Sequence, residues 1–454
     1  MKISGYKEKY EKMTCAPVEK LVLNLAGPSI TIMLTTAVYN VTDTFFVSTL
    51  GTSQVGAVGI AFPLMAIIQA MGFFFGQGSG NYMARALGAQ DTESASRMAV
   101  TGLVSGFICM AIIASAGIVF LEPLVAGLGA TQTIKPFAAE YVFFVLLASP
   151  WMVAATILNQ QLRFQGSAAI AMVGMLSGAV LNILLDPLFI FVFGLGVRGA
   201  AVATLISQMT SFLILFFYAA GRKGNMPIRF KYFSPTIQRY AEMFKGGVPA
   251  LIRQSLMSIA SIAINHFARP YGDAAIAAIS ISNRLSMFAT SVILGFGQGF
   301  QPVCGFNYGA KLYGRVKKAF WFCVKFCCSG LLLISIAMAV FAPQIIALFR
   351  KDDLDVILIG ALGLRLQCIS LPFTAGIIMV NMMTQTMGKA FEASVIAFSR
   401  HGIFLIPGLI ILSPLFGLTG IQLARPVSDL ASLIIVIPVM IKTLKELPQK
   451  ALHV

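Results

Sequence analysis

Charged residues are scarce in this sequence. Asp, Glu, Lys and Arg make up 11% of its 454 residues, whereas hydrophobic residues make up 57% and the mean hydropathy is +0.84. A soluble globular chain has about 25% charged and about 45–50% apolar residues, so the composition excludes most soluble proteins. At about 20 apolar residues for each crossing, the chain has enough for about a dozen transmembrane helices and little left for a soluble domain.

Histidine and cysteine are too few or too scattered for common chemical sites. The three histidines, His266, His401 and His453, stand far apart, and no pair of the seven cysteines has the spacing of a zinc site. Most of the cysteines lie in apolar stretches, where a thiol behaves as a small hydrophobic side chain. We therefore expect no metal centre, no resident cofactor and no intramembrane enzyme, which would need such a cluster or a nucleophile with its base.

Two nucleotide-binding motifs are weak or missing. The string Gly194-x-Gly196-x-x-Gly199 matches the dinucleotide fingerprint, but it follows an apolar run and lacks the strand that the motif requires. No G-x-x-x-x-G-K-[ST] sequence occurs, so the chain is not itself an ATP-driven pump. The glycines are better explained as a tight turn between two helices.

Apolar runs bounded by charges and by Pro and Gly turns predict an all-α integral membrane protein with twelve transmembrane helices. An even number of spans places both termini on one side of the membrane. The predicted spans are residues 21–46, 57–80, 98–120, 136–158, 168–193, 200–219, 246–268, 275–303, 319–342, 356–384, 391–414 and 421–441.

The positive charge is distributed unevenly between the two sides of these spans. The chain has 33 Lys and Arg against 17 Asp and Glu, a formal net charge of +16. In a soluble protein this excess would suggest nucleic acid, but in a membrane protein Lys and Arg collect in cytoplasmic loops. The side opposite the two termini has few cations, so we expect both termini to lie in the cytoplasm. We expect no nucleic acid partner. The cations on that side are Lys135, Arg198, Arg269, Arg350 and Lys351.

The chain contains an internal repeat. An offset of 221 residues aligns Pro and Gly along two hundred positions, with one residue inserted midway. This predicts two six-helix bundles related by a pseudo-two-fold axis normal to the membrane, an arrangement typical of transporters. The first bundle is the N-lobe (1–220), the second is the C-lobe (246–454), and a basic cytoplasmic linker (221–245) joins them. The aligned pairs include Pro28 with Pro249, Gly51 with Gly272, Pro150 with Pro372, Asn159 with Asn381, Gly166 with Gly388 and Gly196 with Gly417.

Glycines also recur at four-residue spacing within the spans. Gly72, Gly76 and Gly80 form one series, and Gly295 and Gly299 form another in the second half. Small residues at this spacing favour close packing between helices. A cavity lined by backbone is the alternative.

Three acids lie well inside predicted spans: Asp43, Asp186 and Asp429. A carboxylate at the membrane centre costs several kcal/mol, about 2.5 on the mildest scale, so it is expected to face a cavity or a partner. Asn40 lies one helical turn before Asp43, and Asn182 lies one turn before Asp186. An acid with an amide neighbour suits a proton or Na⁺, and the alternative is an acid neutralised by a structural partner.

Asp429 differs from the other two acids. Arg425 precedes it by four residues on the same helix, which favours a structural ion pair. Further cations lie inside the spans of the second half, and the repeat places no acid there opposite Asp43 or Asp186. We therefore place ion coupling in the first half. The second-half cations are Arg253, Arg284, Lys325, Arg365 and Arg400.

The sequence resembles the multidrug and toxic compound extrusion (MATE) family of bacterial secondary transporters over essentially its whole length. The resemblance rests on the twelve spans, Pro28 with Asn40-x-x-Asp43, Asn182-x-x-x-Asp186-Pro187, and Gly417-x-x-Gly420 before the last span. It implies a V-shaped pair of lobes in the bacterial inner membrane. It also implies export of cationic amphipathic drugs in exchange for H⁺ or Na⁺.

The resemblance also implies roles for individual residues. A cation site in the N-lobe would consist of Asp43, Asn182, Asp186 and Thr204, with Na⁺ as one candidate ion. The substrate cavity would include Met33, Tyr39, Tyr141, Asn159 and Met175. Some members place coupling acids in the seventh and tenth spans, but this chain has Arg253 in the seventh and no acid in the tenth. Independently of the resemblance, Pro28 can bend the first helix and act as a hinge.

Two other transport functions stay open. A lipid-linked glycan flippase would share the two-lobed architecture and would need a strongly cationic cavity, for which the second-half arginines are candidates. A passive channel is compatible with the composition but has no need of two diverged repeats. For the antiporter we expect a monomer in the lipid bilayer with small organic cations as its partners.

Overall fold

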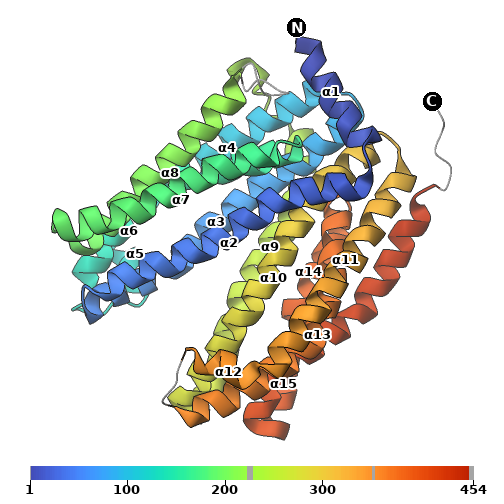
Figure 1. Ribbon diagram of the computed structural model, residues 1–454. Helices are drawn as coiled ribbons and strands as arrows, with labels where there is room; N and C mark the ends of the chain where they lie inside the picture. The colour runs from blue at the N-terminus through green and yellow to red at the C-terminus, as the bar shows by residue number, and fades with distance from the viewer. Residues whose placement is uncertain (1, 222–228, 350–352, 449–454) are drawn as a thin grey trace. The chain divides into compact units, whose positions relative to one another are not determined.

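The computed structural model describes residues 2–221, 229–349 and 353–448, apart from the side chains of residues 2–5, 37, 40, 41, 43–45, 48, 52 and 273. All regular elements in these ranges are helices (Figure 1). The first half contains α1 (Lys2–Cys15), α2 (Val18–Ser48), α3 (Thr52–Gly88), α4 (Thr92–Val119), α5 (Leu121–Gly127), α6 (Lys135–Phe164), α7 (Ala168–Pro187), the π-helix η1 (Leu188–Val192) and α8 (Gly196–Ala220).

The second half repeats this order. After the short 3₁₀-helix η2 (Phe230–Tyr232), the helices are α9 (Ile237–Ala268), η3 (Arg269–Tyr271), α10 (Gly272–Gly309), α11 (Tyr313–Val340), α12 (Ala342–Ala347), α13 (Leu354–Thr386), α14 (Ala390–Phe398), the π-helix η4 (Ser399–Ile403) and α15 (Leu405–Glu446).

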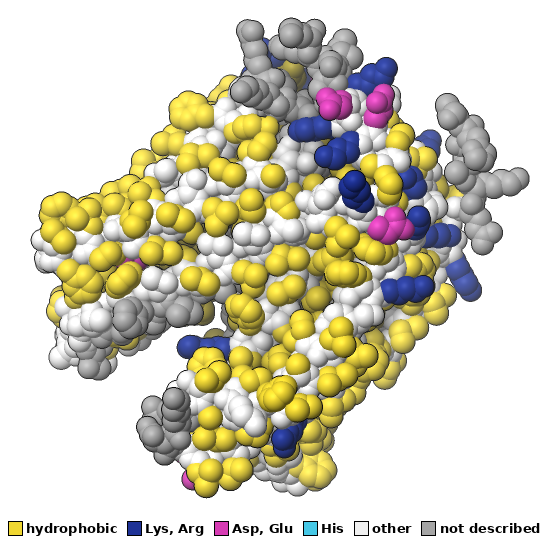
Figure 2. Space-filling view, in the orientation of Figure 1, with side chains coloured by type: hydrophobic (Ala, Val, Ile, Leu, Met, Phe, Trp, Pro, Cys, Tyr) yellow, Lys and Arg dark blue, Asp and Glu magenta, His cyan; other side chains and the backbone are white. Residues whose placement is uncertain are grey.

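Ten of the twelve predicted spans lie within a single α-helix to within two residues at their ends, whereas 168–193 continues from α7 into η1 and 391–414 runs through α14 and η4 into α15. Ten segments of the described residues are long and apolar enough to cross a membrane, and the last of them, Ala390–Glu446, holds the final two predicted spans. These two are separated at Gly417, where φ is +58° and the helix breaks. The first span lies in α2. Figure 2 shows hydrophobic side chains along the outer faces of the helices. The predicted all-α membrane fold is confirmed.

The repeat is visible in the backbone. The left-handed φ values of Gly51, Gly166 and Gly196 recur at Gly272, Gly388 and Gly417. Among the described residues, two that are not glycine have a positive φ: Gln90 at +64° and Lys311 at +60°. They are related by the repeat offset of 221 residues. A side chain rarely adopts this conformation, so the turn after α3 and the turn after α10 have the same unusual geometry. The two halves therefore repeat helix order and turn conformation together.

The chain divides into two compact units that exchange short segments. Unit 1 is Met1–Ala16 with Thr31–Leu251, and unit 2 is Pro17–Ile30 with Ile252–Val454. The start of α2 thus belongs to unit 2, and the start of α9 belongs to unit 1. Both helices pass between the units two residues after a proline, Pro28 or Pro249. An exchange of this kind is not part of the lobe boundaries that the sequence predicts.

Small residues hold each exchanged segment in place. A Cβ atom at Gly299 of α10 would lie 2.5 Å from Ala26 Cα, and one at Gly247 of α9 would lie 2.5 Å from Phe74 O of α3. Ion pairs Lys318–Glu19 (3.0 Å) and Arg85–Glu242 (3.1 Å) tie down the N-terminal parts of α2 and α9. Replacing either glycine would therefore push the segment away from its unit.

The glycine series of the first half serves packing as well. A Cβ at Gly72 would lie 2.9 Å from Thr156 Cβ, and one at Gly76 would lie 2.8 Å from Gln160 Cγ. Both contacts join α3 to α6 within unit 1. Close packing is thus the correct explanation of this spacing, because side chains of α6 fill the space that a cavity would need.

Candidate functional site

Three of the four residues predicted for the cation site meet inside unit 1. Asp186 and Asn182 lie on α7, Thr204 lies on α8, and all three are at most 2% exposed. With the Asn182 amide turned so that both of its ends are satisfied, Nδ2 donates to Asp186 Oδ2 at 2.9 Å and Oδ1 accepts from the Thr204 backbone N–H at 3.2 Å. The resulting cluster combines one carboxylate with neutral oxygen atoms, which suits H⁺ or Na⁺.

The local sequence explains why α7 and α8 approach so closely. A Cβ at Gly199 of α8 would lie 2.7 Å from Phe189 O, so only glycine fits there. Pro187 follows Asp186 directly and has no N–H to donate, and the α-helix gives way to the π-helix η1 at Leu188. Single π turns within helices occur frequently at functional sites. The break therefore lies immediately beside the buried acid.

The other acid of the predicted pair, Asp43, belongs to α2. The backbone of Asp43 and Asn40 forms part of α2, but their side chains lie outside the described residues. Their coupling roles stay predictions.

The predicted cavity residues differ in their exposure. Tyr141 is 1% exposed and Asn159 is 5% exposed, so both lie inside unit 1. Asn159 Nδ2 donates to Ala171 O at 3.1 Å and joins α6 to α7. Met33, Tyr39 and Met175 are partly exposed. The substrate roles of all five stay predictions.

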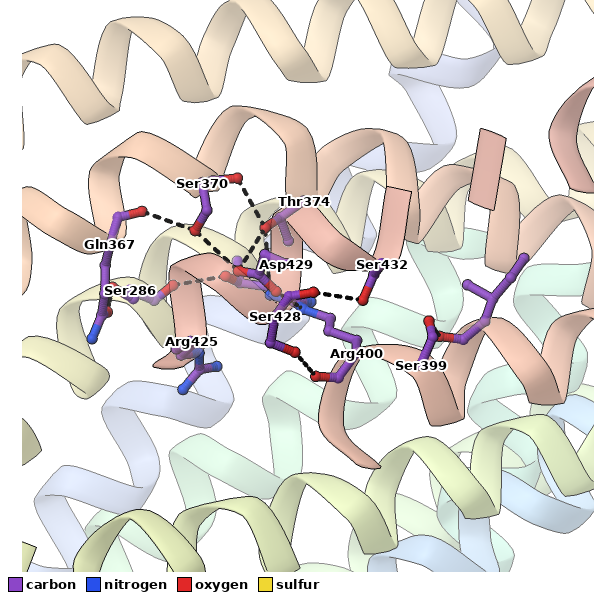
Figure 3. Close-up of polar contacts among 12 residues, drawn as sticks. Ser286, Gln367, Ser370, Thr374, Ser399, Arg400, Arg425, Ser428, Asp429 and Ser432 are labelled. Carbon is purple, nitrogen blue, oxygen red and sulfur yellow. Dashed lines mark hydrogen bonds and ion pairs between the residues drawn. The ribbon is translucent and has the colours of Figure 1, made fainter. Parts of the chain in front are cut away.

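A second polar cluster lies in unit 2 around Asp429, and it corrects one expectation. Asp429 pairs with Arg400 of η4 at 2.6 Å, not with Arg425. Its other oxygen accepts hydrogen bonds from Ser370 at 3.1 Å and Thr374 at 3.4 Å, both on α13. Figure 3 shows the Arg425 side chain directed away from Asp429. The i,i+4 prediction was wrong because Asp429 instead contacts Arg400, which is distant in the sequence, and two hydroxyl groups of α13.

Sequence reasoning missed Ser370 and Thr374. They stand four residues apart on α13, so their hydroxyl groups share one helix face. Both are buried, at 2% and 0% exposure. Their spacing was a usable signal for a polar patch, but nothing in it names Asp429 as the partner.

Comparison with known proteins identifies the family. The MatE family signature matches residues 28–188 and 249–411, more than half of the chain, and its two matches begin at the two repeat-related prolines. The chain belongs to the MATE family. This confirms the resemblance inferred from the sequence, and it makes the protein a multi-pass membrane transporter.

Individual MATE relatives match nearly the whole chain. The multidrug export protein MepA of Staphylococcus aureus strain MSSA476 is 29% identical over 428 residues, which cover 93% of this chain and 94% of MepA. A crystal structure of MATE in complex with MaL6 has a TM-score of 0.91 at 27% identity and covers 96% of this chain and 99% of its own. An outward-facing multidrug resistance MATE transporter of the MOP superfamily has a TM-score of 0.91 at 26% identity. The match covers 97% of this chain and 98% of that transporter's chain.

Proposed function

We propose that this chain is a secondary active multidrug efflux antiporter. It exports cationic amphipathic compounds in exchange for H⁺ or Na⁺ by alternating access. Two MATE relatives support the export of drugs, since one is named a multidrug export protein and another a multidrug resistance transporter. The observation that carries the coupling is the fully buried carboxylate of Asp186 among the neutral groups of Asn182 and Thr204.

Ion binding at this cluster changes the cost of burial. A charged carboxylate in a low-dielectric interior is costly, and H⁺ or Na⁺ neutralises it. The closed cluster is therefore lower in free energy when an ion is bound. Release of the ion favours opening of the cluster to water. We assign the coupling role to Asp43 and Asp186, with Asn40, Asn182 and Thr204 as neighbouring ligands. No other cofactor is needed.

The two prolines give this event a route to a larger movement. α2 carries Asp43 and passes from unit 2 to unit 1 two residues after Pro28, and α9 makes the reverse passage after Pro249. A proline inside a helix removes one backbone hydrogen bond and permits a bend. We assign Pro28 as the hinge of α2. Each net charge that a transport cycle moves inward supplies about 2.3 kcal/mol per 100 mV, enough to support more than a tenfold drug gradient.

The same proposal covers the setting of the protein. The transporter acts as a monomer in a bacterial inner membrane, with both termini in the cytoplasm. Its partners are small organic cations and lipid, and it binds no nucleic acid. The excess of Lys and Arg on one side of the spans supports this orientation.

Transport in liposomes tests the proposal. The purified protein is reconstituted, a proton or a sodium gradient is imposed separately, and ethidium movement is followed by fluorescence. We expect one of the two gradients to drive ethidium, and Asp43→Asn and Asp186→Asn to abolish that response. Glu122→Gln is the matched control, because Glu122 is an exposed acid of unit 1 that pairs only with Lys135 among the described residues. A wild-type protein that ignores both gradients, or acid variants that export normally, would overturn the proposal.

A further inference from the structure

A short aromatic and basic segment precedes α9. Arg229 and Lys231 flank Phe230 in the sequence, and the backbone there forms the 3₁₀-helix η2. The Phe233 N–H donates to Phe230 O at 2.9 Å, and the centres of the two phenylalanine rings lie 6.5 Å apart. Side chains three residues apart share one face of a 3₁₀-helix. The segment therefore has an aromatic face with a cation on either side of Phe230.

Hydrogen bonds fasten this segment to α4 of unit 1. The Ser234 N–H donates to Thr101 Oγ1 at 3.2 Å, and Thr101 Oγ1 lies 3.4 Å from Ser234 O. One turn further along α4, the hydroxyl groups of Ser105 and Tyr240 share a hydrogen bond at 2.8 Å. Both α4 residues follow Arg97, the last charged residue before a long apolar run. They lie where α4 enters the membrane, so the segment lies at the membrane surface.

The large apolar side chains of this region are exposed. Phe230 is 78% exposed, Ile237 is 88% exposed and Phe244 is 52% exposed. Ile237, Ala241 and Phe244 lie on one face of the first turns of α9, at the spacing of an apolar helix stripe. At a membrane surface such side chains enter the boundary between headgroups and acyl chains. Lipid is therefore the partner that fits this face.

The segment also has positive charge without a matching acid. From Arg229 to Lys245 the chain contains four cations and one acid, Glu242. Glu242 is engaged twice, by Arg85 at 3.1 Å and by Lys245 at 2.5 Å. Arg229 and Lys231 are exposed and make no ion pair with any described residue. Two cations thus stand beside the exposed aromatic face.

The repeat provides an internal contrast. At the 221-residue offset the positions of Arg229 and Phe230 correspond to Glu8 and Lys9 of α1. Lys9 Nζ donates to Ser167 Oγ at 2.7 Å, so this part of α1 contacts protein. The combination of exposed aromatic and unpaired basic residues is therefore particular to the middle of the chain and is not a feature that the repeat imposes on both halves.

We propose that Arg229 and Lys231 bind the headgroup of an anionic phospholipid while Phe230 and Ile237 contact its glycerol and upper acyl region. Arginine and lysine both donate to phosphate oxygens, and a headgroup with no cation of its own leaves the negative charge to them. Each Lys or Arg near an anionic membrane surface strengthens the attraction about fivefold. The site goes beyond the proposed antiport, because it uses neither the coupling ion nor the drug.

Fluorescence quenching by brominated lipid tests the site in the full-length protein. Phe230→Trp is made in a background in which the two native tryptophans, Trp151 and Trp321, are replaced by phenylalanine. The protein is reconstituted in phosphatidylcholine vesicles that contain brominated phosphatidylglycerol or brominated phosphatidylcholine with the same acyl chains. We expect both lipids to quench the introduced indole, and phosphatidylglycerol to bind beside it about tenfold more tightly than phosphatidylcholine.

Charge variants separate headgroup recognition from contact with the membrane. Arg229→Gln together with Lys231→Gln should lower the preference for phosphatidylglycerol to about one and leave quenching by phosphatidylcholine unchanged. Either substitution alone should leave a preference of about threefold. Lys442→Gln together with Lys445→Gln is the matched control. It removes two exposed lysines of α15 in unit 2, so the preference should stay at about tenfold.

A second measurement keeps the native tryptophans and decides the question if the tryptophan-free background does not fold. Thermal unfolding of the native chain is followed in detergent with added phosphatidylglycerol or phosphatidylcholine. We expect phosphatidylglycerol to raise the Tm further than phosphatidylcholine does. This difference should disappear in the variant without Arg229 and Lys231 and persist in the control without Lys442 and Lys445.

The possible results are distinct. Absence of quenching by either lipid would place residue 230 in water and overturn the site. Equal affinity for the two lipids before the cations are removed, or an equal loss of preference in the α15 control, would also overturn it. None of these measurements uses an ion gradient or ethidium, so failure of the antiport proposal would leave the lipid site standing.

Discussion

The two units have similar backbone conformations but differ in the charge of equivalent residues. The same turns recur at Gly51 and Gly272 and at Gly196 and Gly417, yet the position of Thr204 in unit 1 carries Arg425 in unit 2. Turn geometry and close helix contacts depend on glycine, since a Cβ would clash or be strained there. The repeat therefore preserves its scaffold while the chemistry of each unit changes independently.

The two described buried acids illustrate this divergence. Asp186 is 0% exposed and lies beside a neutral amide and a neutral hydroxyl, whereas Asp429 is 3% exposed and receives an arginine and two hydroxyl groups. Asp429 is thus a neutralised ion that ties α13, η4 and α15 together. The coupling proposal rests on the full burial of Asp186 beside the neutral groups of Asn182 and Thr204.

The largest effect is expected at Asp429. Asp429→Ala leaves Arg400 in the interior of unit 2 without its counter-charge, and breaking a buried ion pair by removing one partner costs about 3–5 kcal/mol. Thermal unfolding of the purified protein in detergent measures the loss. The matched variant Arg400→Met with Asp429→Leu removes both charges and should recover most of the stability. A single variant that is as stable as the wild type would show that the pair contributes nothing.

At Asp186 the sign of the effect should be reversed. Asp186→Asn removes a buried charge and retains a hydrogen-bonding amide, so the free energy of unfolding should stay the same or rise by up to about 2.5 kcal/mol, the cost of an embedded carboxylate on the mildest scale. The same unfolding assay measures it at pH 8. A loss of several kcal/mol would mean that Asp186, like Asp429, is a structural acid, and the contrast between the units would disappear.

Much of this architecture can be predicted from the sequence, because it depends on local patterns. Long apolar runs predict the helices, the spacing of Pro and Gly predicts the repeat, and Asn182 one turn before Asp186 predicts their contact. The Arg400–Asp429 pair joins residues 29 positions apart and depends on how η4 packs against α15. The exchange of segments after Pro28 and Pro249 depends in the same way on contacts between distant helices. No periodicity in the sequence reports such contacts.

The repeated asparagines offer a finer comparison. Asn159 donates to Ala171 O at 3.1 Å, and Asn381 makes the equivalent bond to Ala393 O at 2.6 Å. Asn381 Oδ1 also accepts from Arg253 Nη1 at 3.1 Å. Asn159→Ala should therefore cost about 0.5–1.5 kcal/mol, and Asn381→Ala about 1.5–3 kcal/mol because it also leaves a charged group unpaired.

Unfolding measured on the two variants in parallel decides this comparison. Removing the arginine should bring the two costs together, so Asn381→Ala in an Arg253→Met background is the control. If the two single variants cost the same, the bond from Arg253 adds nothing to the clamp between α13 and α14.

The smallest effect is expected where α4 and α11 begin. Asp91 caps α4 by accepting from the Ser94 backbone N–H at 2.9 Å, and the equivalent residue Leu312 has similar backbone angles before α11 but no side-chain cap. Asp91→Ala should cost about 0.5–1 kcal/mol.

The hydrogen bond from the Ser94 N–H lowers the pKa of the Asp91 carboxyl below its ordinary value of 3.8. Because the unfolded chain then binds more protons, the stabilisation is present above that ordinary value and is lost as pH falls through the folded pKa. Unfolding measured from pH 5 downward should show the difference between wild type and Asp91→Ala shrinking below the ordinary value. A Leu312→Ala variant should show no such pH-dependent difference from the wild type, since leucine does not titrate, and a difference for Asp91→Ala that stays constant with pH would exclude the ionised cap.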